Sequence, residues 1–149
     1  MWLNKTILVP TDFGASSKEA TNVGVELAQR FQVPLALLHV VSIPSALYTG
    51  QFVVPVGDLV TPMEEAARSQ LDEEVARLRG KGIQVTALLQ LGNPWEDILA
   101  VQKKIGAGLI VMGTHGRRGL FCALIGSVAE RVVRLSHVPV LTLHSEEAS

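Results

Sequence analysis

Residues 109–143 read LIVMGTHGRRGLFCALIGSVAERVVRLSHVPVLTL, and residue types change along them in the order expected for strand, loop, helix and strand. The continuous apolar run from Leu109 to Met112 predicts a buried strand, and glycines and basic residues follow it. A helix is predicted from Ser127 and a second strand from Val138 to Leu143. Such an arrangement can bind an anion. Glycines let the loop backbone approach the anion closely, and a helix start offers unpaired N–H groups.

The glycines in this stretch have a defined spacing. Two residues separate Gly113 from Gly116, and nine residues, Arg117 to Ile125, separate Gly116 from the pair Gly126 and Ser127. The resulting pattern, G-2x-G-9x-G-S, is not a P-loop, which is shorter and has lysine after its last glycine. It is not the dinucleotide pattern G-x-G-x-x-G either. The spacing favours a nucleotide site of a different kind.

Apolar β-rich runs alternate with helical patterns along the whole chain. The predicted strands are residues 6–9, 35–41, 83–91, 109–112 and 138–143. Capping boxes or an early proline predict helices that begin at Ser16, Thr61, Asn93 and Ser127. Residues 42–60 show no clear period and predict an irregular segment, with room for a short strand or helical turn. The alternation predicts one α/β domain, residues 1–149, with a parallel sheet and helices on both faces.

Composition narrows the class of function. A net charge of −1 gives no electrostatic basis for nucleic-acid binding. The single cysteine, Cys122, leaves no internal disulfide and fits a reducing compartment. No apolar run approaches the ~20 residues that span a bilayer, and the N-terminus has no secretory pattern. We therefore expect a cytoplasmic protein with no nucleic-acid or membrane partner.

The glycine motif and the N-terminal half of the chain resemble the universal stress protein family, in the branch that binds ATP. Residues 7–12, ILVPTD, resemble its first strand and the Asp that contacts adenosine, and residues 37–40, LLHV, resemble its second strand. The resemblance implies an adenine nucleotide alpha-hydrolase-like fold, with five parallel strands in the order 3-2-1-4-5. That order places strands one and four side by side, and their helices leave on opposite faces and open a crevice.

The resemblance also implies a ligand, ATP with Mg²⁺, and roles for particular residues. Asp12 would accept a hydrogen bond from adenosine or serve as an outer magnesium ligand, the backbone of Val40 would meet the adenine edge, and the glycine motif would hold ribose and phosphates. Structural interpretations remain open for Asp12 as a turn residue, Ser127 as a helix cap and Arg117 as a solvated loop residue. The complete set of candidate binding residues is Pro10, Thr11, Asp12, Val40, Gly113, Gly116, Arg117, Gly126 and Ser127.

The last predicted strand suggests how the protein assembles. Residues 138–143 carry no charge, and an apolar strand at an open sheet edge invites pairing. The resemblance likewise implies a homodimer through Val138 to Leu143. The function expected is therefore a dimeric, nucleotide-dependent stress-response regulator that acts on a protein partner still to be identified.

Three alternatives compete with this function. A slow ATPase or autophosphorylating enzyme would need metal ligands and a positioned nucleophile, for which only Asp12 and Ser127 are candidates. A nucleotide-free dimerisation module would match the branch of the family that lacks the motif, but here the motif is intact. A flavodoxin-like protein would bind phosphate after its first strand, and residues 10–14 are not rich in hydroxyls and amides.

Overall fold

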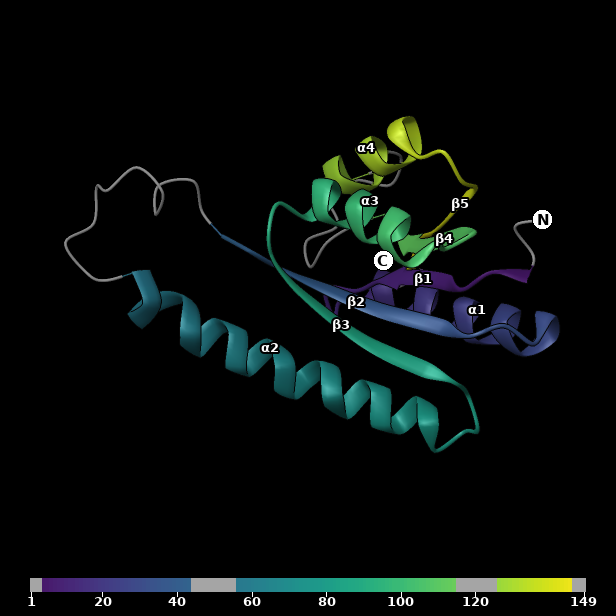
Figure 1. Ribbon diagram of the computed structural model, residues 1–149, viewed down its shortest axis with the longest axis horizontal. Coiled ribbons are helices and arrows are strands. Elements are labelled where there is room, and N and C mark those ends of the chain that lie inside the picture. The colour runs from purple at the N-terminus through teal and green to yellow at the C-terminus, as the bar shows by residue number, and fades with distance from the viewer. Residues whose placement is uncertain (1–3, 44–55, 115–125, 146–149) are drawn as a thin grey trace.

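The structure is a computed structural model, and it describes residues 4–43, 56–114 and 126–145. In these ranges strands and helices alternate, as Figure 1 shows. The strands are β1 (Ile7–Pro10), β2 (Leu35–Ser42), β3 (Val85–Gly92), β4 (Leu109–Gly113) and β5 (Val140–Leu143). The helices are α1 (Ala15–Phe31), α2 (Val56–Arg79), α3 (Pro94–Ile105) and α4 (Ser127–Leu135).

The five strands form one sheet in the order β3-β2-β1-β4-β5, and every adjacent pair is parallel. The predicted order 3-2-1-4-5 is confirmed. Ile7 of β1 pairs with Leu35 on one side and with Leu109 on the other, so β1 lies at the centre of the sheet. The sheet therefore reverses its winding direction between β1 and β4, as the expected crevice requires.

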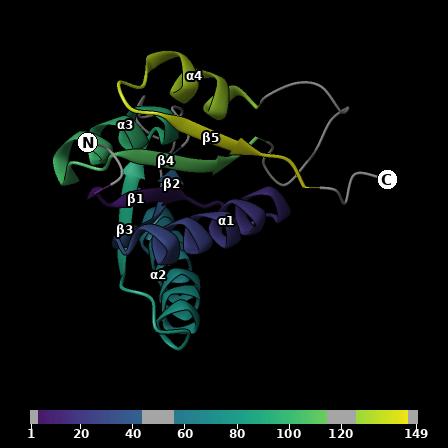
Figure 2. The same cartoon turned by 90° about the vertical axis from the view of Figure 1, so that its right-hand side faces the viewer.

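Helices cover both faces of the sheet, with α1 and α2 on one face and α3 and α4 on the other (Figure 2). The side chains of β1 alternate between the two layers, because successive residues of a strand point to opposite faces. Ile7 and Val9 pack with α1 and α2, whereas Leu8 packs with α3 and α4. All three side chains are 0–2% exposed, which explains why the strand reads as a continuous apolar run.

Two of the four predicted helix starts are corrected by the structure. Helix α1 begins at Ala15 with Gly14 as its N-cap, so Ser16 does not cap it. Helix α2 begins at Val56, and Pro62 lies inside it rather than at its start. The Ser16 side chain is buried because it packs against the end of β4, and this tertiary contact takes the place of the predicted capping role.

The other two helices begin where the sequence predicts, although without the predicted side-chain bonds. Helix α3 follows the N-cap Asn93 with proline at its start, and it ends at the left-handed Gly106, as expected. Helix α4 begins at Ser127, but Gly126 is its N-cap, which corrects the capping interpretation of Ser127. Neither N-cap makes a side-chain hydrogen bond.

Several segments differ in extent from the prediction, and β3, for example, begins at Val85 rather than at residue 83. Strand β5 begins at Val140 rather than Val138, because Val138 donates its N–H to the Ser136 hydroxyl and is held in a turn. Of the irregular segment 42–60, residues 56–60 are helical and belong to α2, and residues 44–55 lie outside the described residues.

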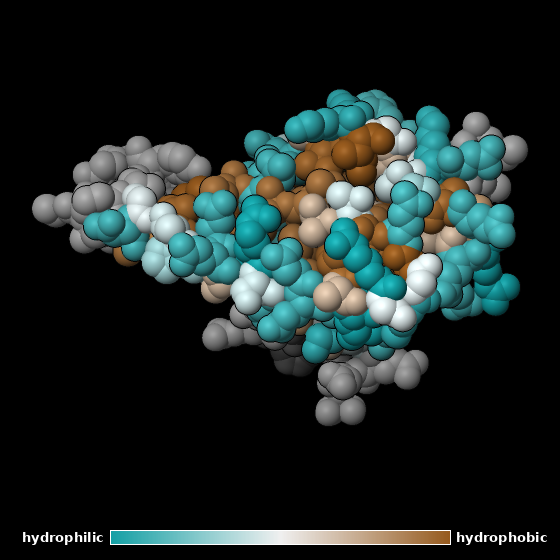
Figure 3. All heavy atoms as spheres, turned by 60° about the horizontal axis from the view of Figure 1, so that its bottom comes forward, coloured by the Kyte–Doolittle hydropathy of each residue, from teal (hydrophilic) through white to brown (hydrophobic). Residues whose placement is uncertain are grey.

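The outer surface on the side of α2 and β3 is mixed. Figure 3 shows hydrophobic residues that reach the surface in patches between polar ones. Leu59 and Met63 on α2 are among the large hydrophobic residues that stay exposed. No helix among the described residues has both the length and the apolar character needed to cross a membrane.

Candidate functional site

A pocket of about 680 Å³ lies at the carboxyl ends of β1, β2 and β4. Volumes of this size are typical of sites for small molecules and cofactors. The pocket is closed on one side by α2 and on the other by the starts of α3 and α4. The lining residues used below are Pro10, Thr11, Asp12, Ser17, His39, Val40, Met63, Gln70, Gly113, Thr114, Gly126 and Ser127.

The turn after β1 holds the Asp12 carboxylate in a defined position. Its Oδ1 accepts hydrogen bonds from the N–H of Gly14 at 2.8 Å and from the hydroxyl of Ser17 at 2.7 Å. The Asp12 N–H in turn donates to the same hydroxyl at 3.2 Å. Asp12 is therefore a turn residue, as its structural interpretation stated, and it also lines the pocket.

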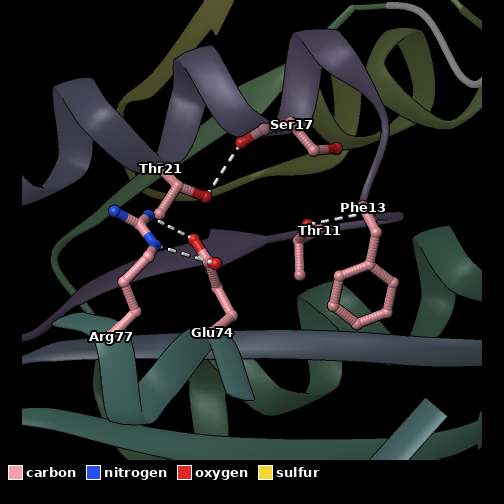
Figure 4. A network of polar contacts seen from close by, with 6 residues as sticks. All are labelled: Thr11, Phe13, Ser17, Thr21, Glu74 and Arg77. Carbon is pink, nitrogen blue, oxygen red and sulfur yellow. Dashed lines mark hydrogen bonds and ion pairs between the residues drawn. The ribbon is translucent and has the colours of Figure 1, made fainter. Parts of the chain in front are cut away.

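His39 braces this turn from the neighbouring strand β2. The Thr11 carbonyl oxygen can only accept, so the His39 Nδ1 at 2.6 Å must carry the proton of this bond. The rings of His39 and Phe13 lie 4.7 Å apart between centroids. Phe13 has a left-handed backbone, with φ of 65°, and its N–H donates to the Thr11 hydroxyl, as Figure 4 shows. Phe13 does not line the main pocket but a second hollow beside α2.

Gly113 ends β4 at a point where the start of α1 comes very close. A Cβ atom built on Gly113 would lie 2.6 Å from both the carbonyl carbon and the Cβ of Ser16. Real Cβ atoms essentially never approach so closely. The first glycine of the motif is therefore required by packing between α1 and β4, in addition to lining the pocket.

The start of α4 faces the same pocket. The Gly126 N–H donates to the Thr114 carbonyl at 2.5 Å, and this bond ties the helix start to the end of β4. Ser127, Val128 and Ala129 follow in the first turn of α4 and also line the pocket. Backbone N–H groups in the first turn of a helix have no partner within the helix, and with the helix dipole they attract anions. This end of the pocket suits a phosphate group.

The structure brings most of the candidate residues together. Pro10, Thr11 and Asp12 from the first motif line one pocket with Val40 and with Gly113, Gly126 and Ser127 from the glycine motif. Gly116 and Arg117 lie outside the described residues.

Several lining residues were not predicted from the sequence. His39 had a weak signal, because it precedes the candidate Val40 in the chain, whereas Ser17 lies five residues after Asp12 in α1 and had none. Met63 and Gln70 reach the pocket from α2, and nothing in their local sequence marks them.

Few side chains around the pocket could supply oxygen ligands to a metal ion. The described residues contain no group of three or more His, Cys, Asp or Glu residues that could hold an ion. Asp12 offers a carboxylate and Ser127 a hydroxyl, both at the pocket. This donor set fits Mg²⁺ only as the companion of a nucleotide, since Mg²⁺ is commonly held by one or two protein oxygens together with substrate phosphates.

Three charged groups with shifted pKa values lie outside the main pocket. A hydrogen bond from Arg77 lowers the pKa of Glu74, and the same bond raises the pKa of Arg77 (Figure 4). Burial raises the pKa of Asp97, and the negative charge of Glu96 adds to that effect. The first two shifts arise from an ion pair within α2, and the third from the burial of Asp97 in the first turn of α3.

A doubly wound parallel sheet with a pocket at the reversal between β1 and β4 defines an α/β protein of the type that binds ligands at strand ends. Residues 3–144 match the model of the universal stress protein family, and the chain belongs to that family. Universal stress protein MJ0531 of Methanocaldococcus jannaschii is 30% identical over 142 residues, which are 95% of this chain and 82% of that protein.

Solved structures of the same family share the fold. A family member from Burkholderia pseudomallei is 29% identical with a TM-score of 0.76, over 95% of this chain and 96% of that one. A universal stress protein in complex with cAMP has a TM-score of 0.70 at 22% identity, over 95% of this chain and 98% of that one. The Archaeoglobus fulgidus protein in complex with dAMP has a TM-score of 0.68 at 20% identity, with the same coverages of 95% and 98%.

Proposed function

We propose that this protein is a nucleotide-dependent stress-response regulator that binds ATP, together with Mg²⁺, in the pocket between β1 and β4. The observation that carries the proposal is the meeting of the Pro10–Asp12 turn and the two ends of the glycine motif, Gly113 and Gly126, in one pocket. Neighbours that hold cAMP and dAMP support an adenine nucleotide as the ligand class. Adenine, a ribose-type sugar and phosphate are common to cAMP, dAMP and ATP.

Each part of the nucleotide has a chemical counterpart in the pocket. The Asp12 carboxylate, held through Oδ1, can accept hydrogen bonds from the adenosine portion. Val40 at the end of β2 offers backbone groups to the adenine edge. The start of α4 offers N–H groups and a positive dipole end to the phosphates. Ser127 adds a hydroxyl at that end, suited to a phosphate or to its Mg²⁺.

Gly126→Val is expected to abolish the stabilisation that ATP gives to the protein. Gly126 has φ of −57° and ψ of 155°, a conformation open to valine, so the variant should fold. Because Gly126 lines the pocket beside the start of α4, we expect the added side chain to take up space at the phosphate end. In the wild-type protein, ATP at one hundred times its Kd should raise the free energy of unfolding by ~2.7 kcal/mol. Thermal unfolding with and without Mg-ATP, together with calorimetric titration, measures the effect.

Gly57→Val is the matched control for this experiment. Gly57 lies in α2, and a Cβ atom at this position meets nothing within 4 Å. This control should retain the full response to ATP. Binding of ATP to Gly126→Val with unchanged affinity, or no heat from the wild-type protein at millimolar ATP, would overturn the proposed function.

We further propose that the protein forms a homodimer through β5. This strand is at the edge of the sheet, and Leu141 in it is 39% exposed. Val133 and Leu135 of the adjacent α4 are also exposed. An uncharged edge strand with exposed apolar neighbours favours pairing with a second chain. The proposed contact covers the segment Val138 to Leu143, and the assembled dimer would act on a further protein partner.

Leu141→Lys is expected to convert the dimer to a monomer, because lysine on an edge strand opposes strand pairing. Sedimentation equilibrium should show the change at concentrations where the wild-type protein is dimeric. Leu59→Lys is the control, since Leu59 is 38% exposed and lies on α2, which packs on β2 and β3 at the other end of the sheet from β5. A monomeric wild-type protein, or a Leu141→Lys variant that remains dimeric, would exclude this interface.

A further inference from the structure

Thr114 lies where the end of β4, the start of α4 and the end of β5 meet. Its N–H donates to the Leu143 carbonyl at 2.9 Å, and its own carbonyl accepts the Gly126 N–H at 2.5 Å. Its hydroxyl donates to the Leu143 carbonyl at 3.2 Å and lies 2.7 Å from the Nδ1 of His144. Thr114 is only 2% exposed, although it lines the pocket.

We infer that Thr114 is a positioning residue that couples the nucleotide pocket to the open edge of the sheet. The inference rests on the proposed nucleotide function. The carbonyl of Thr114 holds the start of α4, whose N–H groups face the pocket. Its N–H and hydroxyl hold the last residues of β5. A ligand that favours one position of Gly126 therefore favours one position of Thr114 and of the end of β5.

The hydroxyl makes this coupling stronger than strand pairing alone. Strand β5 has four residues, and among the described strands it pairs with β4 alone, in a register that runs from Ile110↔Val140 to Gly113↔Leu143. The contacts of Thr114 extend that ladder beyond the last pair. They also add a side-chain anchor, which depends on the residue type at position 114 rather than on the backbone.

The buried hydroxyl is satisfied in either tautomer of His144. If Nδ1 carries a proton, it donates to the Thr114 oxygen, and the hydroxyl proton is left for the Leu143 carbonyl. If Nδ1 carries none, it accepts the hydroxyl proton instead. An aliphatic residue at position 114 can make neither bond, so it removes the side-chain anchor between β4 and the end of β5.

The coupling works in both directions. If nucleotide binding tightens the end of β5, then restraint of β5 must tighten nucleotide binding by the same factor. A dimer formed through β5 would therefore bind the nucleotide more tightly than a monomer does. The edge strand would report the occupancy of a pocket to which β5 itself contributes no lining residue.

The test compares Thr114→Val, which keeps the shape but lacks the hydroxyl, with Thr114→Ser, which keeps the hydroxyl. Amide hydrogen exchange is followed at Gly126 and at residues 140–144, with and without Mg-ATP, and ATP affinity is measured by calorimetry. We expect ATP to slow exchange at residues 140–144 in the wild-type protein and in Thr114→Ser. In Thr114→Val that slowing should be weaker, because the backbone bonds of residue 114 remain but the side-chain anchor is gone, and ATP affinity should fall roughly five- to tenfold.

Failure of the inference and failure of the proposed function give different results. If the wild-type protein binds no ATP, the proposed function fails. Amide exchange measured without ATP still tests whether Thr114 couples Gly126 to the end of β5. Without ATP, Thr114→Val should speed exchange at both Gly126 and residues 140–144 relative to Thr114→Ser, at equal global stability in urea. Two results would overturn the coupling. One is that Thr114→Val without ATP changes exchange at residues 140–144 but not at Gly126. The other is that ATP slows exchange at residues 140–144 as much in Thr114→Val as in the wild-type protein.

Discussion

Asp12→Asn is expected to leave the fold intact and to weaken ATP binding by roughly ten- to a hundredfold. The amide oxygen of Asn can take the place of Oδ1, so the Gly14 N–H and the Ser17 hydroxyl keep their acceptor. The amide nitrogen would then replace Oδ2, and it presents a donor where the ligand requires an acceptor. The negative charge is lost as well.

Calorimetric titration with Mg-ATP measures this loss, and urea unfolding checks the fold. Asp72→Asn, an exposed change on α2 that removes the same charge, is the control and should bind ATP normally. Asp12→Ala should behave differently from Asp12→Asn, because two donors lose their acceptor and the protein loses ~1–3 kcal/mol of stability. Normal ATP affinity in Asp12→Asn would remove Asp12 from the site.

Gly113→Ala is expected to destabilise the protein by about 1–3 kcal/mol, even without a ligand. The added methyl group would lie 2.6 Å from the backbone of Ser16, so α1 or β4 must move to accommodate it. Urea unfolding with amide exchange in α1 measures the effect. Gly57→Ala is the control, because it adds a methyl group to open space in a helix and should be neutral or gain up to ~1 kcal/mol. Wild-type stability in Gly113→Ala would refute the packing role of Gly113.

Together these variants separate the two kinds of glycine in the motif. Gly113→Ala should lose ATP affinity because the pocket walls shift, with a matching loss of stability. Gly126→Val should lose ATP affinity while most of the stability remains, since its backbone conformation suits other residues. These two results would show that Gly113 is required by the fold and Gly126 by the proposed ligand.

Periodicity was sufficient to predict the layered fold. Buried runs such as residues 7–9 and 109–112 read as strands because both faces of a parallel sheet are covered. The helix cores were also predictable, for example Leu71 and Val75 on α2, because burial follows the helical repeat. The strand order depended on the resemblance to the family, since periodicity carries no information about which strands are neighbours.

Local signals failed where a tertiary contact competed with them. The serine at position 16 has the sequence of a helix cap, but packing against Gly113 takes it into the interior. Val138 has the composition of a strand residue, but the Ser136 hydroxyl holds it in a turn. In both cases a short-range preference worth about 1 kcal/mol was outweighed by how the elements pack.

The sequence alone was enough to predict the alternation of strands and helices, the family resemblance and the two motifs that meet at the pocket. Only the tertiary structure revealed that α2 supplies a wall of that pocket, that His39 braces the turn at Thr11, and that Thr114 joins Gly126 to the end of β5. The reason is physical. Periodicity and capping act over a few residues. These contacts join residues 12 to 30 positions apart, or whole elements, and arise only when the sheet brings them together.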